Sequence, residues 1–198
     1  MQLIVATRNA HKTREIQRIL GPTFTVNDLS AHSEIPHMSE TGKSYEENAI
    51  LKAVSASGHL PNLVVADDSG LEVDALRGAP GIFSARYAGE NATDKQNIDR
   101  LLGELARVDE TKKSARFRCV IALARQGELL GTFEGIVEGT IVKRRRGSYG
   151  FGYDPIFAPR GFEETFAELP PEVKNTISHR AKALRELTAK LVALTTAD

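Results

Sequence analysis

The sequence predicts a mixed α/β fold in which helices pack around one mixed β-sheet. Three observations lead to this prediction. The N-terminal half alternates short apolar runs with amphipathic segments, which is typical of strand-helix units. The middle contains several β-rich segments, and the last segment carries leucines at three- and four-residue spacings, which indicate a helix with one buried face.

Local signals define the elements of the N-terminal half. The pairs Ser44 with Glu47 and Thr93 with Gln96 have the spacing of a capping box, which marks the first turn of a helix. Gly21-Pro22 is a stop signal for the helix before it. The elements expected here are a strand at 3–6, a helix to about residue 20, a helix from 45 to about 58, a strand at 63–66, a short strand near 71–75 and a helix from 94 to about 105.

The second half is expected to be rich in β-structure. Gln126-Gly127 lies between two apolar runs and predicts a two-residue hairpin turn. The expected strands are 115–125, 128–137 and 140–142, and the expected final helix carries the stripe Leu184, Leu187, Leu191 and Leu194. The stripe favours a core face, with a dimer seam as the alternative.

The bulk composition argues against several classes of partner. The 26 acidic and 26 basic residues give a net charge of zero, which disfavours a general affinity for nucleic acid or for an anionic membrane. No segment approaches the ~20 apolar residues of a membrane span, and the first residues are typical of a strand and not of a signal peptide. The single cysteine, Cys119, lies in an apolar run, so we expect no internal disulfide and a cytoplasmic location.

Two adjacent carboxylates follow the apolar run at 63–66. They are Asp67 and Asp68, and Ser69 and Gly70 follow them. We therefore expect a strand over the apolar run that ends at the acidic pair and carries oxygen ligands at its tip. Carboxylate oxygens suit Mg²⁺, which proteins usually hold by one or two carboxylates together with substrate phosphates. A solvated corner between a strand and a turn is the alternative when this segment is taken alone.

The segment from Thr7 to Lys12 lies between a strand and the N-terminus of a helix. Backbone N–H groups and the positive end of the helix dipole make such a junction an anion site. Thr7 and Asn9 add short polar groups, and Lys12 adds a mobile positive charge. The segment lacks the glycines and the Lys-Ser/Thr pair of a Walker loop, and an ordinary helix cap with a surface lysine explains it equally well.

Two later segments offer groups that can recognise a base or a phosphate. The run Gly150 to Pro155 places two aromatic side chains beside a carboxylate, and aromatic faces stack on bases. The segment at 174–180 contains lysine and arginine, whose side chains only donate hydrogen bonds. A tight turn and a helix cap are the structural alternatives for these two segments. The arginine run at 144–146 favours a solvated turn over contact with nucleic acid.

Taken together, these segments resemble the inosine/xanthosine triphosphate pyrophosphatases, which hydrolyse non-standard purine nucleotides. Each motif alone is weak, but the ordered set covers nearly the whole chain and is specific. Ser69 and Tyr153 resemble the bacterial branch, the dITP/XTP pyrophosphatases, whereas Arg8 replaces a glycine found in many relatives. The motifs are Thr7-Arg8-Asn9 with Lys12, Glu40-Thr41-Gly42, Glu47-Asn48-Ala49, 66–71, 78–87, 151–155 and Ser178-His179-Arg180.

The resemblance implies an elongated mixed sheet in two lobes around a substrate cleft, with residues 1–198 as a single domain, and a homodimer. It also implies Mg²⁺-dependent hydrolysis of ITP, dITP or XTP to the monophosphate and pyrophosphate. Asp68 is the implied proton acceptor and Mg²⁺ ligand, and Glu40 is the second carboxylate, with Glu46 and Glu47 as alternatives. The implied substrate contacts are Thr7, Arg8, Asn9, Ala10, His11 and Lys12 for the phosphates, and Ser69, Phe151, Gly152, Tyr153, Asp154, Lys174, His179 and Arg180, mostly for the base.

Two other functions are compatible with parts of this pattern. One is a pyrophosphatase for modified pyrimidine nucleotides, which substrate profiling would separate. The other is a non-catalytic nucleotide- or RNA-binding module that uses the arginines at 144–146. The pair Asp67-Asp68 argues against this second function, because carboxylates repel phosphate unless a metal intervenes. The sequence assigns no single role to 78–87, where a turn, a dimer contact and an active-site wall all fit, and it does not explain how guanine is rejected.

Overall fold

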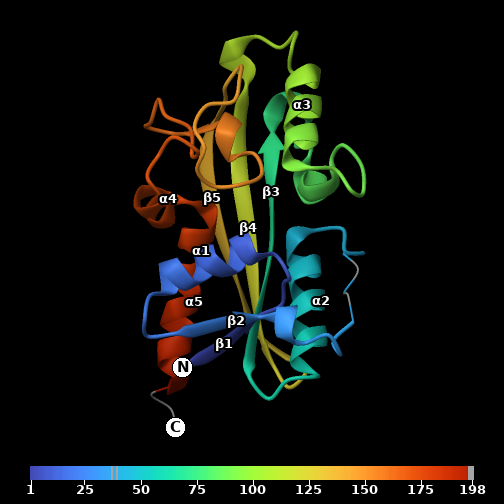
Figure 1. The fold of residues 1–198 in the computed structure, drawn as a ribbon, viewed down its shortest axis with the longest axis vertical. Coiled ribbons are helices and arrows are strands. Elements are labelled where there is room, and N and C mark those ends of the chain that lie inside the picture. Colours follow the sequence, from blue (N-terminus) through green and yellow to red (C-terminus); the bar gives the residue numbers. More distant parts are fainter. Residues whose placement is uncertain (37, 39, 196–198) are drawn as a thin grey trace. The chain divides into compact units, whose positions relative to one another are not determined.

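The computed structural model describes residues 1–36, 38 and 40–195 (Figure 1). The strands are β1 (Gln2–Val5), β2 (Thr25–Asp28), β3 (Leu63–Val73), β4 (Ser114–Arg125), β5 (Glu128–Ile141) and β6 (Phe157–Pro159). The α-helices are α1 (Ala10–Leu20), α2 (Tyr45–Ser57), α3 (Asp94–Glu104), α4 (Pro171–Ile177) and α5 (His179–Thr195). Short 3₁₀ turns lie at Leu29–Ala31, Asp74–Leu76, Gly81–Arg86, Glu110–Lys112 and Asp154–Ile156.

The strands form a mixed sheet in the order β2-β1-β3-β4-β5-β6. β1 pairs in parallel with both β2 and β3, whereas β5 and β6 are antiparallel. Gln126 and Gly127 join β4 to β5 with φ angles of 52° and 82°, the positive values that a two-residue hairpin turn requires. The predicted mixed sheet and the predicted hairpin are therefore both confirmed.

The chain divides into two compact units, which are described separately. The first unit comprises Met1–Asp68, Cys119–Gly135 and His179–Asp198. The second unit comprises Ser69–Arg118 and Ile136–Ser178. The strands β3, β4 and β5 each contribute residues to both units.

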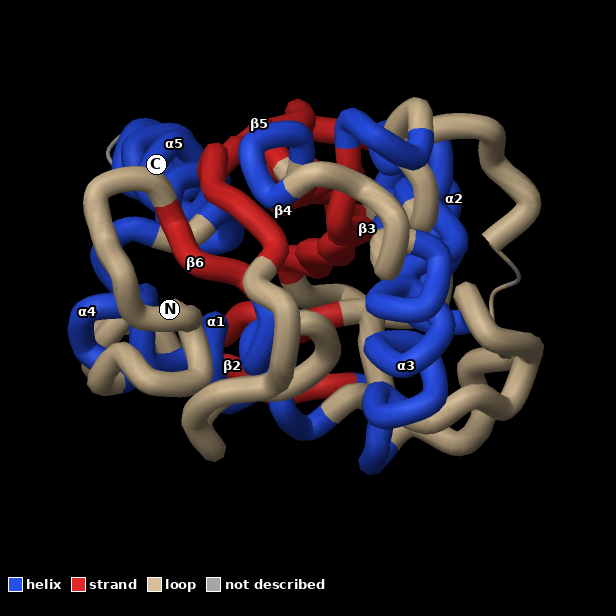
Figure 2. Tube along the Cα trace, turned by 90° about the horizontal axis from the view of Figure 1, so that it is seen from above, coloured by secondary structure: helices blue, strands red, loops and turns tan. Residues whose placement is uncertain are grey.

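In the first unit, helices cover both faces of the strands. Leu184, Leu187 and Leu191 of α5 are fully buried in one cluster with Val65 of β3 and Ile16 of α1. Figures 1 and 2 show α2 and α5 on opposite sides of the strands. The predicted leucine stripe is thus a core face; the side chain of Leu194 lies outside the described residues.

The second unit has its own core, which is rich in aromatic side chains. The ring centroids of Phe117 and Phe157 lie 4.7 Å apart in an edge-to-face contact, and Phe166 lies 5.3 Å from Phe157. Such contacts stabilise a core beyond the area that they bury. Ile98 and Leu101 pack α3 against the same cluster.

The predicted helix starts are confirmed by their caps. The Ser44 side chain accepts the Glu47 N–H at the start of α2, and Thr93 with Gln96 forms a complete capping box at the start of α3. The Glu47 carboxylate binds the Lys43 N–H, so α2 has only half of the predicted box. These local signals were sufficient because a cap depends only on residues within one turn.

Two strand boundaries differ from the prediction. β3 does not end before Asp67; it continues through the acidic pair to Val73, so the second short strand near 71–75 is part of it. β5 likewise runs without a break to Ile141. Aspartate and glycine are unfavourable inside strands, and the prediction followed that preference. Side chains from distant helices overcome it in β3, as described below.

Cys119 is completely buried in β4. Burial, together with the charge of nearby Asp67, raises the pKa of its thiol to about 12. A thiol of this kind is not ionised at neutral pH and does not act as a nucleophile. Among the described residues there is no helix with the length and apolar character needed to cross a membrane.

Candidate active site

Asp67 and Asp68 project from opposite faces of β3. Successive side chains of a strand alternate between its two faces. Asp67 meets side chains from α1 and α5, whereas Asp68 meets side chains from α2. Both aspartates are buried, with 4% and 5% of their surface exposed, so each carboxylate depends on the partners that its own face supplies.

Asp67 is bound by two cations. Its Oδ1 lies 3.1 Å from the Lys12 Nζ, and its Oδ2 accepts hydrogen bonds from Arg180 Nη2 at 2.8 Å and Nε at 3.3 Å. Arg180 also donates to Glu15 of α1 and is only 1% exposed. Burial favours the neutral acid, but Lys12, Arg180 and Lys52 outweigh it and hold the pKa of Asp67 far below its usual range. Asp67 is therefore a permanent anion that fixes Lys12 and Arg180.

Asp68 is held by α2. Its Oδ1 accepts a hydrogen bond from Lys52 Nζ at 2.9 Å, and its Oδ2 accepts one from the Asn48 side chain at 3.2 Å. Asn48 in turn accepts the Gly42 N–H at 2.8 Å, which ties the preceding loop to the same point. Burial and the charge of Glu40 raise the pKa of Asp68 against the opposing effect of Lys52. A carboxylate with a raised pKa is a better proton acceptor than an ordinary aspartate.

Lys52 joins three oxygen atoms around Asp68. Its Nζ lies 2.9 Å from Asp68, 3.0 Å from Glu40 Oε1 and 2.8 Å from the Asp67 carbonyl oxygen. Burial alone favours a neutral amine, but Asp68, Glu40 and Asp67 outweigh it and raise the pKa of Lys52. This arrangement shows that the oxygens of Glu40 and Asp68 converge on one positive charge.

The same two carboxylates fit the donor chemistry of a hard divalent cation. Glu40 is favoured over its neighbours, because it shares Lys52 with Asp68, whereas Glu46 binds Thr132 and Glu47 binds the Lys43 N–H. Within the described ranges, no group of three or more histidine, cysteine or acidic side chains could hold a metal ion. Among the described residues, Glu40 and Asp68 are the pair that fits, and a substrate or water would supply further ligands.

The segment from Thr7 to Lys12 forms the N-terminus of α1. Asn9 caps the helix, since its side chain accepts the N–H groups of His11 at 2.9 Å and Lys12 at 3.4 Å. Arg8 donates to the carbonyl oxygen of Ile35 at 2.7 Å and so fixes a neighbouring loop. These contacts occupy groups that were expected to meet an anion, whereas the Thr7 hydroxyl accepts the Asn9 N–H and keeps its own hydrogen for donation. Ala10 is the first, exposed residue of α1, and the His11 ring contacts Arg14 at 3.2 Å.

The aromatic segment lies in the second unit and is organised by Asp154. The buried carboxylate of Asp154 accepts the Phe151 N–H at 2.8 Å and a hydrogen bond from Lys174 Nζ at 2.6 Å. Lys174 Nζ also lies 5.1 Å from the centre of the Phe151 ring. Gly150 has a φ of 74°, and a Cβ there would stand 1.9 Å from the Asp154 carboxylate. Glycine is thus required at 150 for both reasons.

The segment at 78–87 supports the aromatic segment. The Tyr153 hydroxyl donates to the Ser84 carbonyl oxygen at 2.9 Å, and the Ser84 hydroxyl accepts the Leu71 N–H at 2.9 Å. Ser69 precedes this contact in β3 and is half-buried. The segment thus supports Tyr153 from below, and its roles as a dimer contact or an active-site wall stay predictions.

The proposed base contacts divide between the two units. The first unit contains His179 and Arg180, which begin α5. The second unit contains Ser69, Phe151, Gly152, Tyr153, Asp154 and Lys174. Arg180 donates to Asp67 and Glu15, and His179 is buried. The base-binding roles given to these residues stay predictions.

Two of the three arginines at 144–146 are paired inside the second unit. Arg145 donates to Asp99 and to the Lys95 carbonyl oxygen, the latter at 3.1 Å. Arg146 lies 3.1 Å from Glu168 and donates to the Glu163 carbonyl oxygen. These pairings favour a structural role for Arg145 and Arg146 over contact with nucleic acid.

Sequence reasoning missed Lys52 and Asn48, which hold Asp68, and Glu15, which holds Arg180. A signal for Lys52 was present. Ala49, Ala53 and Ala56 share one helical face with it, and all three are fully buried. A lysine inside such an apolar stripe indicates a buried partner of opposite charge.

Comparison with known proteins gives the family to which this pattern of residues belongs. The sequence profile of the Ham1 family matches residues 3–190. A protein of Bacillus subtilis named dITP/XTP pyrophosphatase is 46% identical over 193 residues, which are 97% of this chain and 98% of that protein. The chain belongs to the Ham1 family. A protein of the same name from Methylococcus capsulatus is 49% identical over 197 residues, 98% of each chain.

A solved structure agrees with this membership of the Ham1 family. The Ham1 protein of Staphylococcus aureus superposes with a TM-score of 0.85 at 42% identity and covers 98% of this chain and 99% of its own. The resemblance drawn from the motifs is confirmed, and so is the mixed α/β fold with its flanking helices.

Proposed function

We propose that this chain hydrolyses dITP, ITP and XTP to the nucleoside monophosphate and pyrophosphate. Its enzyme class is confirmed by the bacterial relatives named dITP/XTP pyrophosphatase, which it matches over nearly their whole length. The observation that carries the mechanism is the buried Asp68, whose two oxygens are bound by Lys52 and Asn48. The choice among the three nucleotides is part of the proposal.

Asp68 is the proposed proton acceptor. A water molecule attacks the α-phosphorus, the bond from that phosphorus to the bridging oxygen breaks, and pyrophosphate leaves. The proton of the water passes to Asp68, whose raised pKa suits this task. Asn48 and Lys52 keep the carboxylate in one orientation, so little reorganisation is needed when the water reacts.

Glu40 and Asp68 are the residues that would hold Mg²⁺. When bound, Mg²⁺ would neutralise phosphate charge and favour the nucleophilic form of water. The convergence of both carboxylates on Lys52 supports this assignment, because it shows a position where positive charge is stabilised. Lys12 supplies a further positive charge at the start of α1, where an anion is also favoured by the helix dipole.

Base selection is assigned to the aromatic segment. Phe151 offers a face for stacking, Asp154 an acceptor for the purine N1–H, and Lys174 a donor for the 6-oxo group. Adenine has a bare N1 and a 6-amino group, so it would meet like groups in this site. Sites that hydrogen-bond a substrate in this way can discriminate by ~10⁴. A pyrimidine offers less surface to Phe151, so pyrimidine nucleotides are the less favoured substrate class.

The direct test measures pyrophosphate released from dITP, ITP, XTP, ATP, GTP, CTP and dUTP, each with Mg²⁺ and with a chelator. We expect kcat/KM for the first three to exceed that for the other four by up to ~10⁴-fold, and release from any of them only with Mg²⁺. Release of inorganic phosphate in place of pyrophosphate would contradict attack at the α-phosphorus. Highest activity on dUTP or CTP would favour the pyrimidine alternative. The homodimer implied by the resemblance and the cytoplasmic location expected from the single cysteine stay predictions.

Replacing Lys12 with alanine is expected to weaken triphosphate binding without changing base choice. The loss of one charge near the phosphates should lower kcat/KM for dITP by about 10- to 100-fold, and for ATP by the same factor. Lys43→Ala, an exposed lysine of the same unit, is the matched control for net charge. A changed ratio of dITP to ATP activity would instead place Lys12 at the base.

A further inference from the structure

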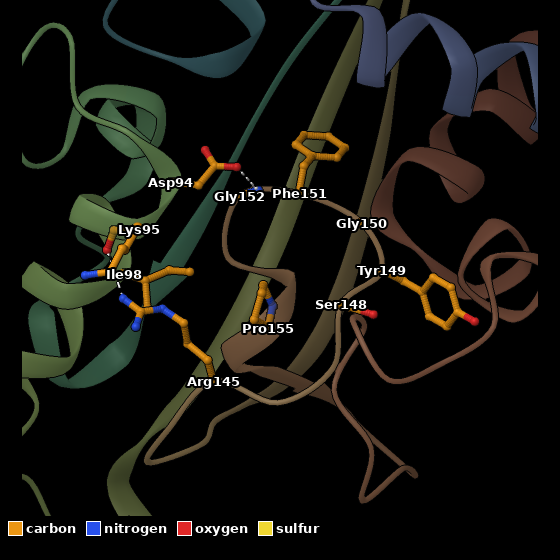
Figure 3. Close-up of a pocket in the computed structure, with 10 residues that line it drawn as sticks. All are labelled: Asp94, Lys95, Ile98, Arg145, Ser148, Tyr149, Gly150, Phe151, Gly152 and Pro155. Atoms are coloured by element: carbon orange, nitrogen blue, oxygen red, sulfur yellow. Dashed lines mark hydrogen bonds between the residues drawn. The ribbon is translucent and has the colours of Figure 1, made fainter.

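The aromatic segment is held through two consecutive backbone N–H groups. The Phe151 N–H donates to Asp154, three residues away, at 2.8 Å. The Gly152 N–H donates to Asp94 Oδ2 at 2.6 Å, and Asp94 is the first residue of α3. Figure 3 shows Asp94 reaching from α3 to the backbone at Gly152, next to the Phe151 ring. The orientation of Phe151 thus depends on a local carboxylate and on one from a distant helix.

Asp94 is not needed to begin its own helix. Thr93 accepts the Gln96 N–H, and the Gln96 side chain accepts the Thr93 N–H at 2.8 Å, which completes the capping box. A carboxylate that accepts a backbone N–H makes one of the stronger hydrogen bonds in proteins. The Asp94 carboxylate is therefore available to bind Gly152, and its removal leaves the α3 cap intact.

A second contact ties the same loop to α3. Arg145 precedes the aromatic segment and binds the carbonyl oxygen of Lys95, which follows Asp94 directly, and the carboxylate of Asp99, about one turn further along the helix. α3 thus holds the loop on both sides of Tyr149.

Packing leaves the loop partly open on the side that faces α3. An open cavity of about 400 Å³ lies between α3 and the loop, lined among others by Ile98, Pro155 and Phe151 (Figure 3). Gly150 and Gly152 have φ angles of 74° and 58°, and glycine gives the chain freedom to leave these conformations. Where side chains leave space and the backbone is permissive, hydrogen bonds decide the conformation.

We propose that Asp94 is a positioning residue for base recognition, because it fixes Gly152 and with it the ring of Phe151. This inference rests on the proposed function, in which Phe151 stacks on the purine base. Asp94 has no role in the hydrolytic step itself; it lowers the cost of ordering the loop when the base binds. Its loss should therefore raise KM and leave kcat nearly unchanged.

The test compares Asp94→Ala with Asp94→Asn, which keeps an acceptor oxygen, and with Asp109→Ala as control. Asp109 is an exposed aspartate of the same unit that likewise accepts a backbone N–H, that of Thr111 at 2.9 Å. We expect Asp94→Ala to raise KM for dITP about fivefold with kcat within twofold, as the loss of one hydrogen bond would give. Asp94→Asn should restore most of the affinity, and Asp109→Ala should change neither constant.

Amide hydrogen exchange at Gly152 tests the contact without any substrate. Asp94→Ala should increase the exchange rate of this amide about tenfold, whereas Asp109→Ala should not. Unchanged exchange in Asp94→Ala, or equal KM changes in Asp94→Ala and Asp109→Ala, would overturn the proposal. If the unaltered protein releases no pyrophosphate, the proposed function fails, and the exchange experiment still decides whether Asp94 holds the loop.

Discussion

Replacing Asp68 with asparagine is expected to lower turnover about a thousandfold, or ~4 kcal/mol of barrier, because the proton acceptor is lost. Substrate binding should fall less, since Lys12 and the aromatic segment are untouched. The measurement is pyrophosphate release from dITP under saturating conditions, together with a thermal melt of the variant. Activity within tenfold of the unaltered protein would show that another group accepts the proton.

A second variant separates loss of chemistry from loss of folding. In Asp68→Asn, the new amide must face both Lys52 and the amide of Asn48, so one donor meets another donor. The double substitution Asp68→Asn with Asn48→Asp exchanges the carboxylate and the amide and restores a donor and an acceptor at this contact. Its melting temperature should therefore lie closer to that of the unaltered protein, while the double variant remains inactive. Recovery of turnover in the double variant would show that the position of the carboxylate is not critical.

Replacing Arg180 with methionine is expected to destabilise the protein by ~3–5 kcal/mol. The change leaves the buried carboxylates of Asp67 and Glu15 without their shared cation, and an uncompensated buried charge costs far more than the lost attraction. The melting temperature should fall by ~10 °C or more in a chain of this length. Thermal and urea unfolding measure the effect.

Two comparisons make this second prediction specific. Lys95→Met breaks the pair of Lys95 with Asp99, in which the side chains are 76% and 47% exposed, and should cost less than ~1 kcal/mol. Glu15→Gln added to Arg180→Met removes one of the stranded charges and should recover part of the stability. An Arg180→Met variant as stable as Lys95→Met would show that Lys12 alone compensates Asp67.

Elements with local signals could be predicted from the sequence. The caps at Ser44 and Thr93 and the turn at Gln126-Gly127 depend on residues close together in the chain, and each begins or ends an element where expected. The course of β3 could not be predicted in this way, because its acidic pair has partners on α1, α2 and α5. No single stretch of sequence contains both sides of such a contact.

The candidate site shows the same division. The order of the motifs was enough to recognise the family and to select Asp68 and Glu40. It was not enough to distinguish a residue that meets substrate from one that orients another residue. Arg180 was expected near the base; its guanidinium binds Asp67 and Glu15, and its contact with a base stays a prediction. Asn48 belonged to a recognised motif, but its bond to Asp68 spans 20 residues and has no local signature.

Because Asp67 and Asp68 point to opposite faces of β3, this strand is more sensitive to insertions and deletions than to substitutions. Insertion or deletion of one residue between Leu63 and Asp67 would turn each carboxylate toward the wrong helices. After an insertion Asp67 would take the place of Asp68 beside Lys52, and after a deletion Asp68 would take the place of Asp67 beside Arg180. In either case the other aspartate would lose its partners, and the apolar residues shifted with the pair would turn to the opposite face of the sheet. Point substitutions in 63–66 that preserve size leave each aspartate on its own face of the strand. The number of residues from the start of β3 to its acidic pair is therefore constrained, and substitutions in this stretch should be tolerated better than insertions or deletions.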